Sequence, residues 1–215
     1  MSGVLIVSGT DTGIGKTVVA AGLAAALGAH YWKPIQAGTD EGTDSEQGVS
    51  FGVPRARVLP EAYRLVLAAS PHLAFEREGL AVDLGRLALP DVRPLVVEGA
   101  GGLMVPIRRD PPWLMIDQFA RWEAPVLVVA RTGLGTINHS LLSVEALRAR
   151  GVPIAGLLFV GEAHADNEAV IPALTGVRSF GRLPLLDPLD TRTLAEAVAA
   201  HIDLAGLRAA MGLAA

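Results

Sequence analysis

Residues 4–27 read VLIVSGTDTGIGKTVVAAGLAAAL, in which a short apolar run, a glycine-rich turn and a longer apolar stretch follow one another. The run from Val4 to Ser8 predicts a buried β-strand, and the stretch from Lys16 to about Leu27 predicts a helix. The turn between them, Gly9 to Thr17, would bring successive backbone N–H groups and a helix N-terminus to one place. Such a turn binds phosphate, so the stretch predicts the first βαβ unit of an α/β fold with a nucleotide site.

Two side chains at the end of this turn have predicted roles. Lys16 would reach the terminal phosphates, and the hydroxyl of Thr17 would ligate Mg²⁺. The usual pattern, G-x-x-x-x-G-K-[ST], would put glycine at position 10, whereas the chain has Thr10 there and Gly9 one residue earlier. A merely structural glycine-rich turn is the alternative, but strand, Gly-Lys-Thr and helix in this order favour phosphate binding. A dinucleotide site is disfavoured, since no G-x-G-x-x-G opens the helix.

The rest of the chain alternates short apolar runs with helical stretches. We expect strands at His30 to Lys33, Leu95 to Glu98, Val126 to Ala130, Ile154 to Val160 and around Ser179 to Gly181, and helices at Leu114 to Trp122, Ile137 to Arg150, Asn167 to Leu174, Thr191 to His201 and after Asp203. Several of the strands are continuously apolar, as parallel strands covered on both faces should be. The pattern predicts an α/β, doubly wound, mainly parallel sheet in a single domain, residues 1–215. Between Gln36 and Gly52 we expect an exposed functional loop, because no periodicity is present.

Composition excludes several classes of protein. The net charge of -4 and the pI near 5.7 argue against nucleic acid as a partner. The absence of cysteine excludes disulfides, thiolate catalysis and cysteine-ligated metals. The first apolar run, Val4 to Val7, is too short for a signal peptide, and no stretch approaches the roughly 20 apolar residues of a membrane span. We therefore expect a cytoplasmic protein without a membrane partner.

Lysine is rare in this chain, which draws attention to Lys33. Only Lys16 and Lys33 among 18 basic residues are lysines. Lys33 falls at the carboxyl end of the second predicted strand, the edge at which doubly wound sheets bind ligands, and we expect it to be exposed there and to face the phosphates. A solvated lysine before a proline turn is the alternative. The loop that follows offers four acidic residues, any of which could bind Mg²⁺: Asp40, Glu41, Asp44 and Glu46.

Two further segments carry possible ligand-binding groups. Glu98 ends an apolar run and precedes Gly99-Ala-Gly-Gly102, an arrangement typical of a metal ligand at a strand's carboxyl edge, although an acid there could also cap a helix. Leu134-Gly-Thr-Ile-Asn-His-Ser140 precedes a helix and could hold an anion or merely cap that helix. Ser70-Pro-His72 indicates a turn and, by itself, nothing more.

Taken together, five motifs resemble those of the dethiobiotin synthetase family, and the resemblance spans nearly the whole chain. They are GTDTGIGKT at 9–17, YWKPIQ at 31–36, SPH at 70–72, VEGAGG at 97–102 and LGTINH at 134–139. The resemblance implies a P-loop NTPase-like three-layer sandwich and a homodimer with its substrate site at the interface. It further implies ATP- and Mg²⁺-dependent closure of a cyclic urea from 7,8-diaminononanoate and CO₂.

The resemblance also assigns residues. Lys33 and Lys16 would be catalytic, the first stabilising a carbamate and the second the γ-phosphate. Thr17, Asp44 and Glu98 would hold the metal. The residues expected at ATP are Gly13, Ile14, Gly15, Lys16, Thr17, Val18, Asp44, Glu98, Gly99, Ala100, Gly101, Val160, Gly161, Leu183, Pro184 and Leu185. Those expected at the substrate are Thr12, Lys33, Gln36, Ala37, Gly135, Thr136, Ile137 and Asn138, the last four contributed by the other subunit.

Two positions depart from the family pattern. Ala37 stands where relatives have a hydroxyl residue, so that contact to the substrate is either missing or supplied by Gln36 or Thr39. Val160 stands where an adenine-side asparagine is expected, so base recognition would rest on backbone groups near Val160, Gly161 and 183–185.

Three other functions remain open from the sequence. A partitioning or nitrogenase-reductase-type ATPase would carry a signature lysine five residues before Lys16, where this chain has Asp11. A nucleotide-dependent switch would hydrolyse ATP slowly and respond to protein or membrane partners. An amidoligase acting on another small acid is the third.

Overall fold

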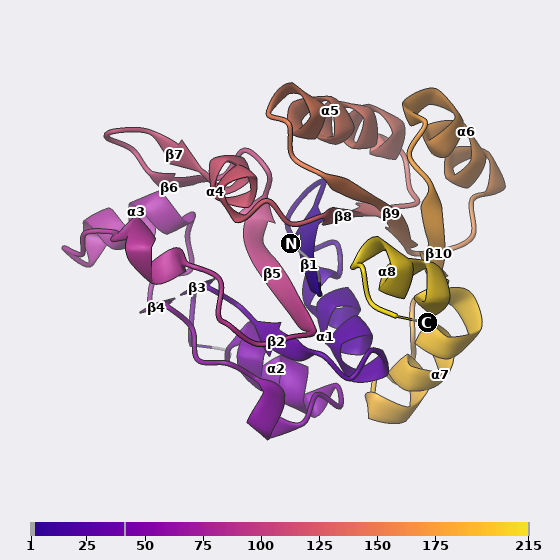
Figure 1. Ribbon diagram of the computed structural model, residues 1–215, viewed down its shortest axis with the longest axis horizontal. Helices are drawn as coiled ribbons and strands as arrows, with labels where there is room; N and C mark the ends of the chain where they lie inside the picture. Colours follow the sequence, from indigo (N-terminus) through magenta and orange to yellow (C-terminus); the bar gives the residue numbers. More distant parts are fainter. Residues whose placement is uncertain (1–2, 41, 215) are drawn as a thin grey trace.

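The computed structural model describes residues 3–40 and 42–214. In that part of the chain, six parallel strands form a central sheet in the order β10-β9-β8-β1-β5-β2 (Figure 1). The strands are β1 (Val4–Gly9), β2 (His30–Trp32), β5 (Leu95–Gly102), β8 (Val126–Arg131), β9 (Ile154–Val160) and β10 (Ser179–Leu183). The predicted doubly wound, parallel architecture is confirmed.

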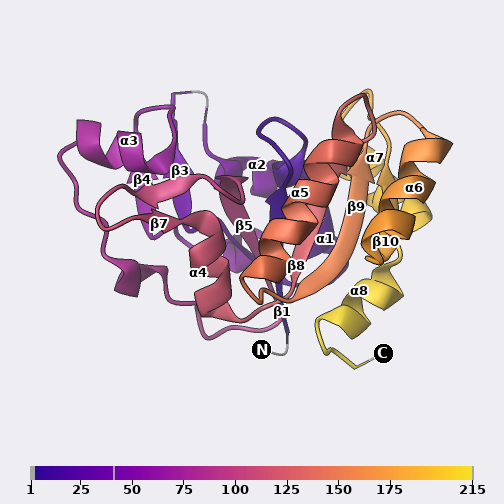
Figure 2. The ribbon, with the colours of Figure 1, turned by 90° about the horizontal axis from the view of Figure 1, so that it is seen from above.

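Helices cover both faces of this sheet (Figures 1 and 2). Their bounds are α1 (Lys16–Ala26), α2 (Asp44–Ser50), α3 (Pro71–Arg77), α4 (Met115–Trp122), α5 (Thr136–Ala149), α6 (Ala165–Thr175), α7 (Thr191–His201) and α8 (Leu204–Ala210). In β1, Val4 and Ile6 pack with α4, α5 and α6, whereas Leu5 and Val7 pack with α1, α7 and α8. Because both faces of β1 are buried, its sequence is continuously apolar.

The sheet topology positions the glycine-rich turn. Strand β1 lies between β5 and β8: after β1 the chain crosses to β2 at one edge of the sheet, whereas after β8 it continues to β9 on the other side. In doubly wound sheets such a reversal of strand order opens a crevice at the carboxyl ends of the strands. The turn from Gly9 to Thr17 follows β1 at this point, so the topology places it where a ligand can enter.

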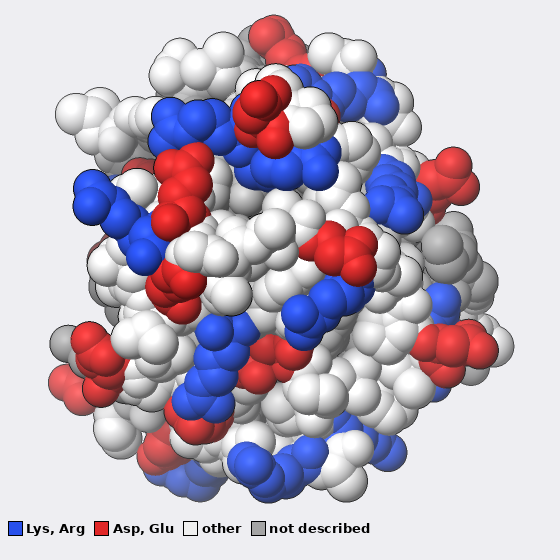
Figure 3. All heavy atoms as spheres, turned by 90° about the vertical axis from the view of Figure 1, so that its left-hand side faces the viewer, with Lys and Arg blue, Asp and Glu red and all other residues white. Residues whose placement is uncertain are grey.

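The structure also contains short strands and 3₁₀ turns that were not predicted from the sequence. Strands β3 (Ile35–Ala37) and β4 (Tyr63–Leu65) form a parallel pair, and β6 (Pro106–Arg108) and β7 (Trp113–Leu114) an antiparallel one. Two 3₁₀ turns, η1 (Arg55–Arg57) and η2 (Leu84–Leu87), connect the larger elements. Over α3 and the β6–β7 segment, basic and acidic side chains alternate (Figure 3), as in the ion pair between Arg109 and Glu76. This face therefore shows none of the uniformly basic surface that nucleic acid requires.

Three local expectations were wrong. The segment from Gln36 to Gly52 is not an irregular loop, since it holds the end of β3 and all of α2. Thr43 and Glu46 form a reciprocal capping box that starts α2, and this signal was present in the sequence. Ser70-Pro-His72 is more than a turn, because Pro71 occupies the first position of α3, where its missing N–H costs nothing. Glu98 does not end its strand, because β5 continues to pair with β1 as far as Gly102.

No helix within residues 3–40 and 42–214 is long and apolar enough to cross a membrane.

Candidate active site

The glycine-rich turn folds tightly back over its own first residue. A Cβ on Gly9 would lie 2.5 Å from Ile14 Cδ1 and 3.1 Å from Lys16 Cδ, so a larger residue there would displace these side chains. Gly15 is the N-cap of α1 with φ 89°, a backbone conformation that favours glycine. No side chain caps this helix, so its first N–H groups remain available to an anion.

Lys16 lies inside the turn. Its ammonium donates a hydrogen bond to the backbone oxygen of Asp11 at 2.8 Å. Burial, and then the nearby positive charge of Lys33, lowers the pKa of Lys16, although Glu98 and Asp44 partly oppose this. A bound phosphate would oppose this lowering of the Lys16 pKa, because its negative charge favours the charged form of the ammonium.

Lys33 connects two carboxylates at the bottom of the crevice. Its Nζ lies 2.6 Å from Asp44 Oδ2 and 2.8 Å from Glu98 Oε1. The expectation of an exposed lysine was wrong, since Lys33 is only 5% exposed and Glu98 only 1%. Burial alone would lower the pKa of Lys33, but Glu98 and Asp44 outweigh it and raise that pKa above its usual value. Lys33 is therefore a permanent cation.

The three predicted metal ligands lie around this ion pair. Thr17 Oγ1 donates to Glu98 Oε1 at 2.9 Å, the same oxygen that Lys33 contacts, and Asp44 contacts Lys33 from the first turn of α2. Hard oxygen atoms with net negative charge suit Mg²⁺, which proteins usually bind through one or two carboxylates together with substrate phosphates. Within the described ranges no group of three or more His, Cys, Asp or Glu could hold a metal. The donor set thus fits Mg²⁺ that is shared with a phosphate.

The other acidic residues of this segment point elsewhere. Glu46 caps α2 and lies 3.6 Å from Arg64, and Asp40 lines a separate surface hollow. Glu41 lies outside the described residues. Of the acids that the structure describes in this segment, Asp44 alone contacts Lys33.

A pocket of about 650 Å³ gathers many of the predicted residues. Those in its wall are Thr12, Gly13, Gly15, Lys16, Thr17, Val18, Lys33, Gln36, Ala37, Asp44, Glu98, Ala100 and Gly101. Sequence reasoning missed the remaining lining residues, which are Ile35, Gln47, Ala68, Ala69, Ser70, Pro71 and Val105. Proline at a helix start was a detectable signal for α3, but nothing local indicated that Ser70 and Pro71 would face this pocket.

Several predicted residues lie outside the pocket wall. Gly99 is adjacent, since its backbone oxygen accepts from Lys33 at 3.3 Å, and the side chain of Ile14 is buried in the core.

Gln36, which lies in the pocket wall, also holds local structure. Its side-chain amide donates to Gly38 O and accepts from the backbone N–H of Asp44.

The residues predicted on the adenine side form a group next to the turn. The side chain of Val160 lies against Gly15, where an added Cβ would be 3.3 Å from Val160 Cγ1. Gly161 N donates to Leu183 O at 3.1 Å. Leu185 is exposed, and Pro184, the residue between these leucines, follows β10. This side offers apolar and backbone groups.

The predicted carboxylate-binding residues lie at the start of α5. Gly135 is the N-cap with φ 91°, and Thr136, Ile137 and Asn138 form the first turn, which has no side-chain cap. None of these four residues is among those that line the pocket of the same chain. The buried hydroxyl of Thr136 has no hydrogen-bond partner.

The parallel sheet and the glycine-rich turn with its lysine define a P-loop nucleotide-binding protein. Solved structures with this fold include the MinC:MinD complex of Aquifex aeolicus, with TM-score 0.59 and 11% identity over 99% of this chain and 96% of that one. A ParA family ATPase of Chlorobium tepidum is similar with TM-score 0.55 and 10% identity over 98% and 97% of the two chains. At such identities the likeness shows the fold alone.

Sequence comparison is more specific. A family model described as an AAA domain matches residues 3–193. ATP-dependent dethiobiotin synthetase BioD of Novosphingobium aromaticivorans is 58% identical over 90% of this chain and 94% of its own length. The protein of the same name in Brucella anthropi is 52% identical over 95% and 96% of the two chains. The chain belongs to the ATP-dependent dethiobiotin synthetase family.

Proposed function

We propose that this chain catalyses the ATP-dependent synthesis of dethiobiotin from 7,8-diaminononanoate and CO₂. The observation that carries the proposal is the position of Lys33, a buried cation between Asp44 and Glu98 in the wall of the same pocket as the phosphate-binding turn. A reaction that forms an anionic carbamate next to ATP needs a cation close to the phosphate-binding turn. The relatives named above support it, and the cysteine-free composition supports a cytoplasmic location.

The first step joins the substrate to CO₂. One amine nitrogen attacks the carbon of CO₂ and loses a proton, which gives a carbamate anion. The positive charge of the Lys33 ammonium stabilises that anion. The contribution of Lys33 is therefore electrostatic.

The second and third steps use and release phosphate. A carbamate oxygen attacks the γ-phosphorus and the bond to ADP breaks, which leaves a carbamic-phosphoric anhydride. The second amine then attacks the carbonyl carbon, and inorganic phosphate leaves as the ring closes. Lys16 and the free N–H groups at the start of α1 hold the phosphate oxygens throughout.

Thr17, Asp44 and Glu98 would hold Mg²⁺. The ion would supply positive charge to the β- and γ-phosphates. Binding of the ion by Asp44 and Glu98 would reduce their pairing with Lys33 and so leave its ammonium available to the carbamate.

A homodimer is part of the proposal. Gly135 to Asn138 begin α5 without a side-chain cap but do not line the pocket of their own chain. The same helix contributes His139 and Leu142 to a separate hollow beside the turn, which exposed Met104 also lines. A second copy that covers this apolar surface would bring its α5 to the pocket, where it would bind the substrate carboxylate.

A coupled assay of ADP release tests the function. We expect release to require both 7,8-diaminononanoate and bicarbonate, and to match dethiobiotin formation one for one. ADP release at the same rate without the diamine would contradict the proposal and favour a nucleotide-dependent switch, the second candidate that the fold of MinD and ParA brings forward.

One contact argues against that switch. The signature lysine of those ATPases would stand at position 11, where Asp11 instead pairs with Arg131 at 2.9 Å and accepts from the backbone N–H of Thr12. A negatively charged side chain at this position would repel the phosphates that a signature lysine binds.

A further inference from the structure

Tyr31 is a buried phenol that the predicted site did not include. It lies in the middle of β2, opposite Val96 of β5, and is 0% exposed. Its hydroxyl donates a hydrogen bond to Glu98 Oε2 at 2.6 Å. Thr17 and Lys33 contact the other oxygen, Oε1. The two oxygens of Glu98 therefore have separate partners, and Tyr31 holds the one that the catalytic groups do not use.

The ring of Tyr31 also lies close to the helix that carries Asp44. A Cβ added to Gly48 of α2 would lie 3.6 Å from both Cδ1 and Cε1 of this ring. Gly48 follows Asp44 by one helical turn, so both residues lie on the same face of α2. One side chain therefore packs against the element that positions one acid and hydrogen-bonds to the other acid.

The phenol can act on Glu98 only as a donor. A carboxylate oxygen can only accept, so the hydroxyl must be the donor in the 2.6 Å hydrogen bond. Hydrogen bonds to a metal-binding carboxylate fix the direction in which its free oxygen points, and their loss typically weakens metal binding by about 10–100-fold.

We propose that Tyr31 is a positioning residue of the metal site: it fixes Glu98 through Oε2 and α2 through Gly48, so that Oε1 of Glu98 and the carboxylate of Asp44 meet at one point. This inference rests on the proposed role of Glu98 and Asp44 in binding Mg²⁺. It assigns Tyr31 no contact with ATP or the diamine.

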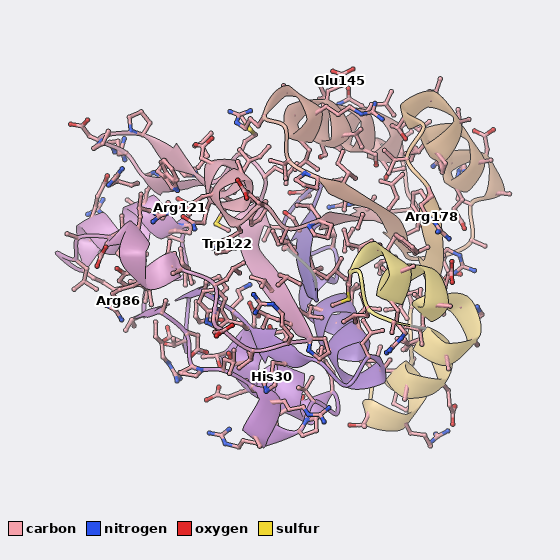
Figure 4. The ribbon with its side chains drawn as sticks, viewed as in Figure 1. His30, Arg86, Arg121, Trp122, Glu145 and Arg178 are labelled. Atoms are coloured by element: carbon pink, nitrogen blue, oxygen red, sulfur yellow. The ribbon has the colours of Figure 1, made fainter. Side chains whose placement is uncertain are left out.

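The chain offers a matched control, because Tyr63 is its only other tyrosine. Tyr63 is also buried and its hydroxyl is also hydrogen-bonded, to the backbone O and N of Asp83. Arg86 lies over its ring, 4.3 Å from the centroid. Figure 4 shows Arg86 well apart from His30, the residue that precedes Tyr31. The Tyr63→Phe variant thus removes an equivalent hydroxyl from another part of the core.

The experiment compares Tyr31→Phe with Tyr63→Phe in the full chain. Mn²⁺ serves as the probe: its binding to protein saturated with a non-hydrolysable ATP analogue is followed by loss of the free-ion EPR signal. We expect Tyr31→Phe to weaken Mn²⁺ binding by about tenfold or more and to raise the Mg²⁺ needed for half-maximal turnover equally. The kcat at saturating Mg²⁺ should stay near the wild-type value. Tyr63→Phe should lower the melting temperature and leave Mn²⁺ binding unchanged.

Three results would overturn the proposal. One is Mn²⁺ binding by Tyr31→Phe that equals wild type despite a lowered melting temperature, since Tyr31 would then be only a core residue. Another is a loss of kcat that added Mg²⁺ does not restore. The third is wild-type protein that binds no Mn²⁺ beside the analogue.

Two provisions keep the test decisive. If Tyr31→Phe alone does not fold, the double variant Tyr31→Phe/Gly48→Ala is used. Alanine favours helix α2, and its Cβ would lie at an ordinary contact distance from the ring. If wild type binds Mn²⁺ normally but makes no dethiobiotin, the proposed function fails, whereas the effect of Tyr31→Phe on metal binding still supports the assignment of Tyr31.

Discussion

Helices α1 and α5 begin in the same way but in different surroundings. Their N-caps, Gly15 and Gly135, have φ values of 89° and 91°, and neither helix has a side-chain cap or an acidic residue in its first turn. Helices α2, α7 and α8, by contrast, begin with Thr43, Asp190 and Asp203, whose side chains accept from backbone N–H groups. The starts of α1 and α5, each with a glycine N-cap and no side-chain cap, are therefore suited to bind anions from outside the helix.

What surrounds each start differs. The start of α1 lies in the 650 Å³ pocket together with Lys16, Lys33 and Glu98. The start of α5 follows Leu134, which is 104% exposed, and leads to exposed Leu142. In the proposed mechanism, α1 serves the chemistry of its own chain, whereas α5 binds the substrate of the partner chain across a dimer interface.

The largest expected effect tests the chemistry at α1. Lys33→Gln should reduce dethiobiotin formation by about a thousand-fold, since the carbamate loses its cation. Because Lys33 is buried between two acids, the change should also lower the free energy of unfolding by about 3–5 kcal/mol, measured by urea denaturation. Arg64→Gln, which removes an exposed cation from β4, is the control and should change neither quantity. Near-normal turnover by Lys33→Gln would exclude its assigned role.

The metal site should show the next largest effect. Glu98→Gln keeps the shape of the side chain but removes its charge, so the Mg²⁺ concentration for half-maximal ADP release should rise by about 10–100-fold. The same titration on Glu46→Gln, an exposed acid that caps α2, is the control. An unchanged Mg²⁺ titration for Glu98→Gln would remove Glu98 from the metal site.

The start of α5 gives a smaller and more selective effect. Asn138→Asp adds a negative charge to the first turn without changing the size of an exposed side chain. It should raise the KM for diaminononanoate about tenfold through repulsion of the substrate carboxylate, with little change in kcat. The melting temperature should not fall, because an acid in the first turn favours the helix. A KM equal to that of wild type would mean that this helix start does not bind the substrate.

The smallest effect concerns the nucleotide base. If the base lies against Val160, Gly161 and Leu183–Leu185, it meets apolar and backbone groups, which discriminate weakly. Replacing ATP with GTP or CTP should therefore change kcat/KM by less than about tenfold. Strict ATP dependence would indicate a recognition element elsewhere.

The sequence was sufficient to predict those parts of the fold that short stretches of residues determine. The apolar runs of β1, β5, β8 and β9 and the order of the turn motif were sufficient to predict the doubly wound sheet. Thr17 and Asp44 were predicted as metal ligands only because a motif or a resemblance indicated them. Helix α2 was missed although its capping box was visible, because the polar composition between Gln36 and Gly52 hid it.

Burial was harder to predict than position. Lys33 follows β2 as expected, but its charge suggested an exposed side chain, and the two acids that allow its burial come from elements 11 and 65 residues further along the chain. The contact of Tyr31 with Glu98 spans 67 residues and has no local signal. Such contacts follow from the order of the strands, which places β2 beside β5.

The claim that one site uses α1 from one chain and α5 from its partner can be tested by mixing two variants. Asn138→Asp chains are paired with an excess of Lys33→Gln chains, which cannot turn over, and heterodimers are isolated through different tags. The intact Lys33 of the Asn138→Asp chain would then meet an unmodified α5 from its partner, so its KM for diaminononanoate should return to the wild-type value. A KM that stays at the raised Asn138→Asp value, or a failure of the two chains to pair, would contradict the account.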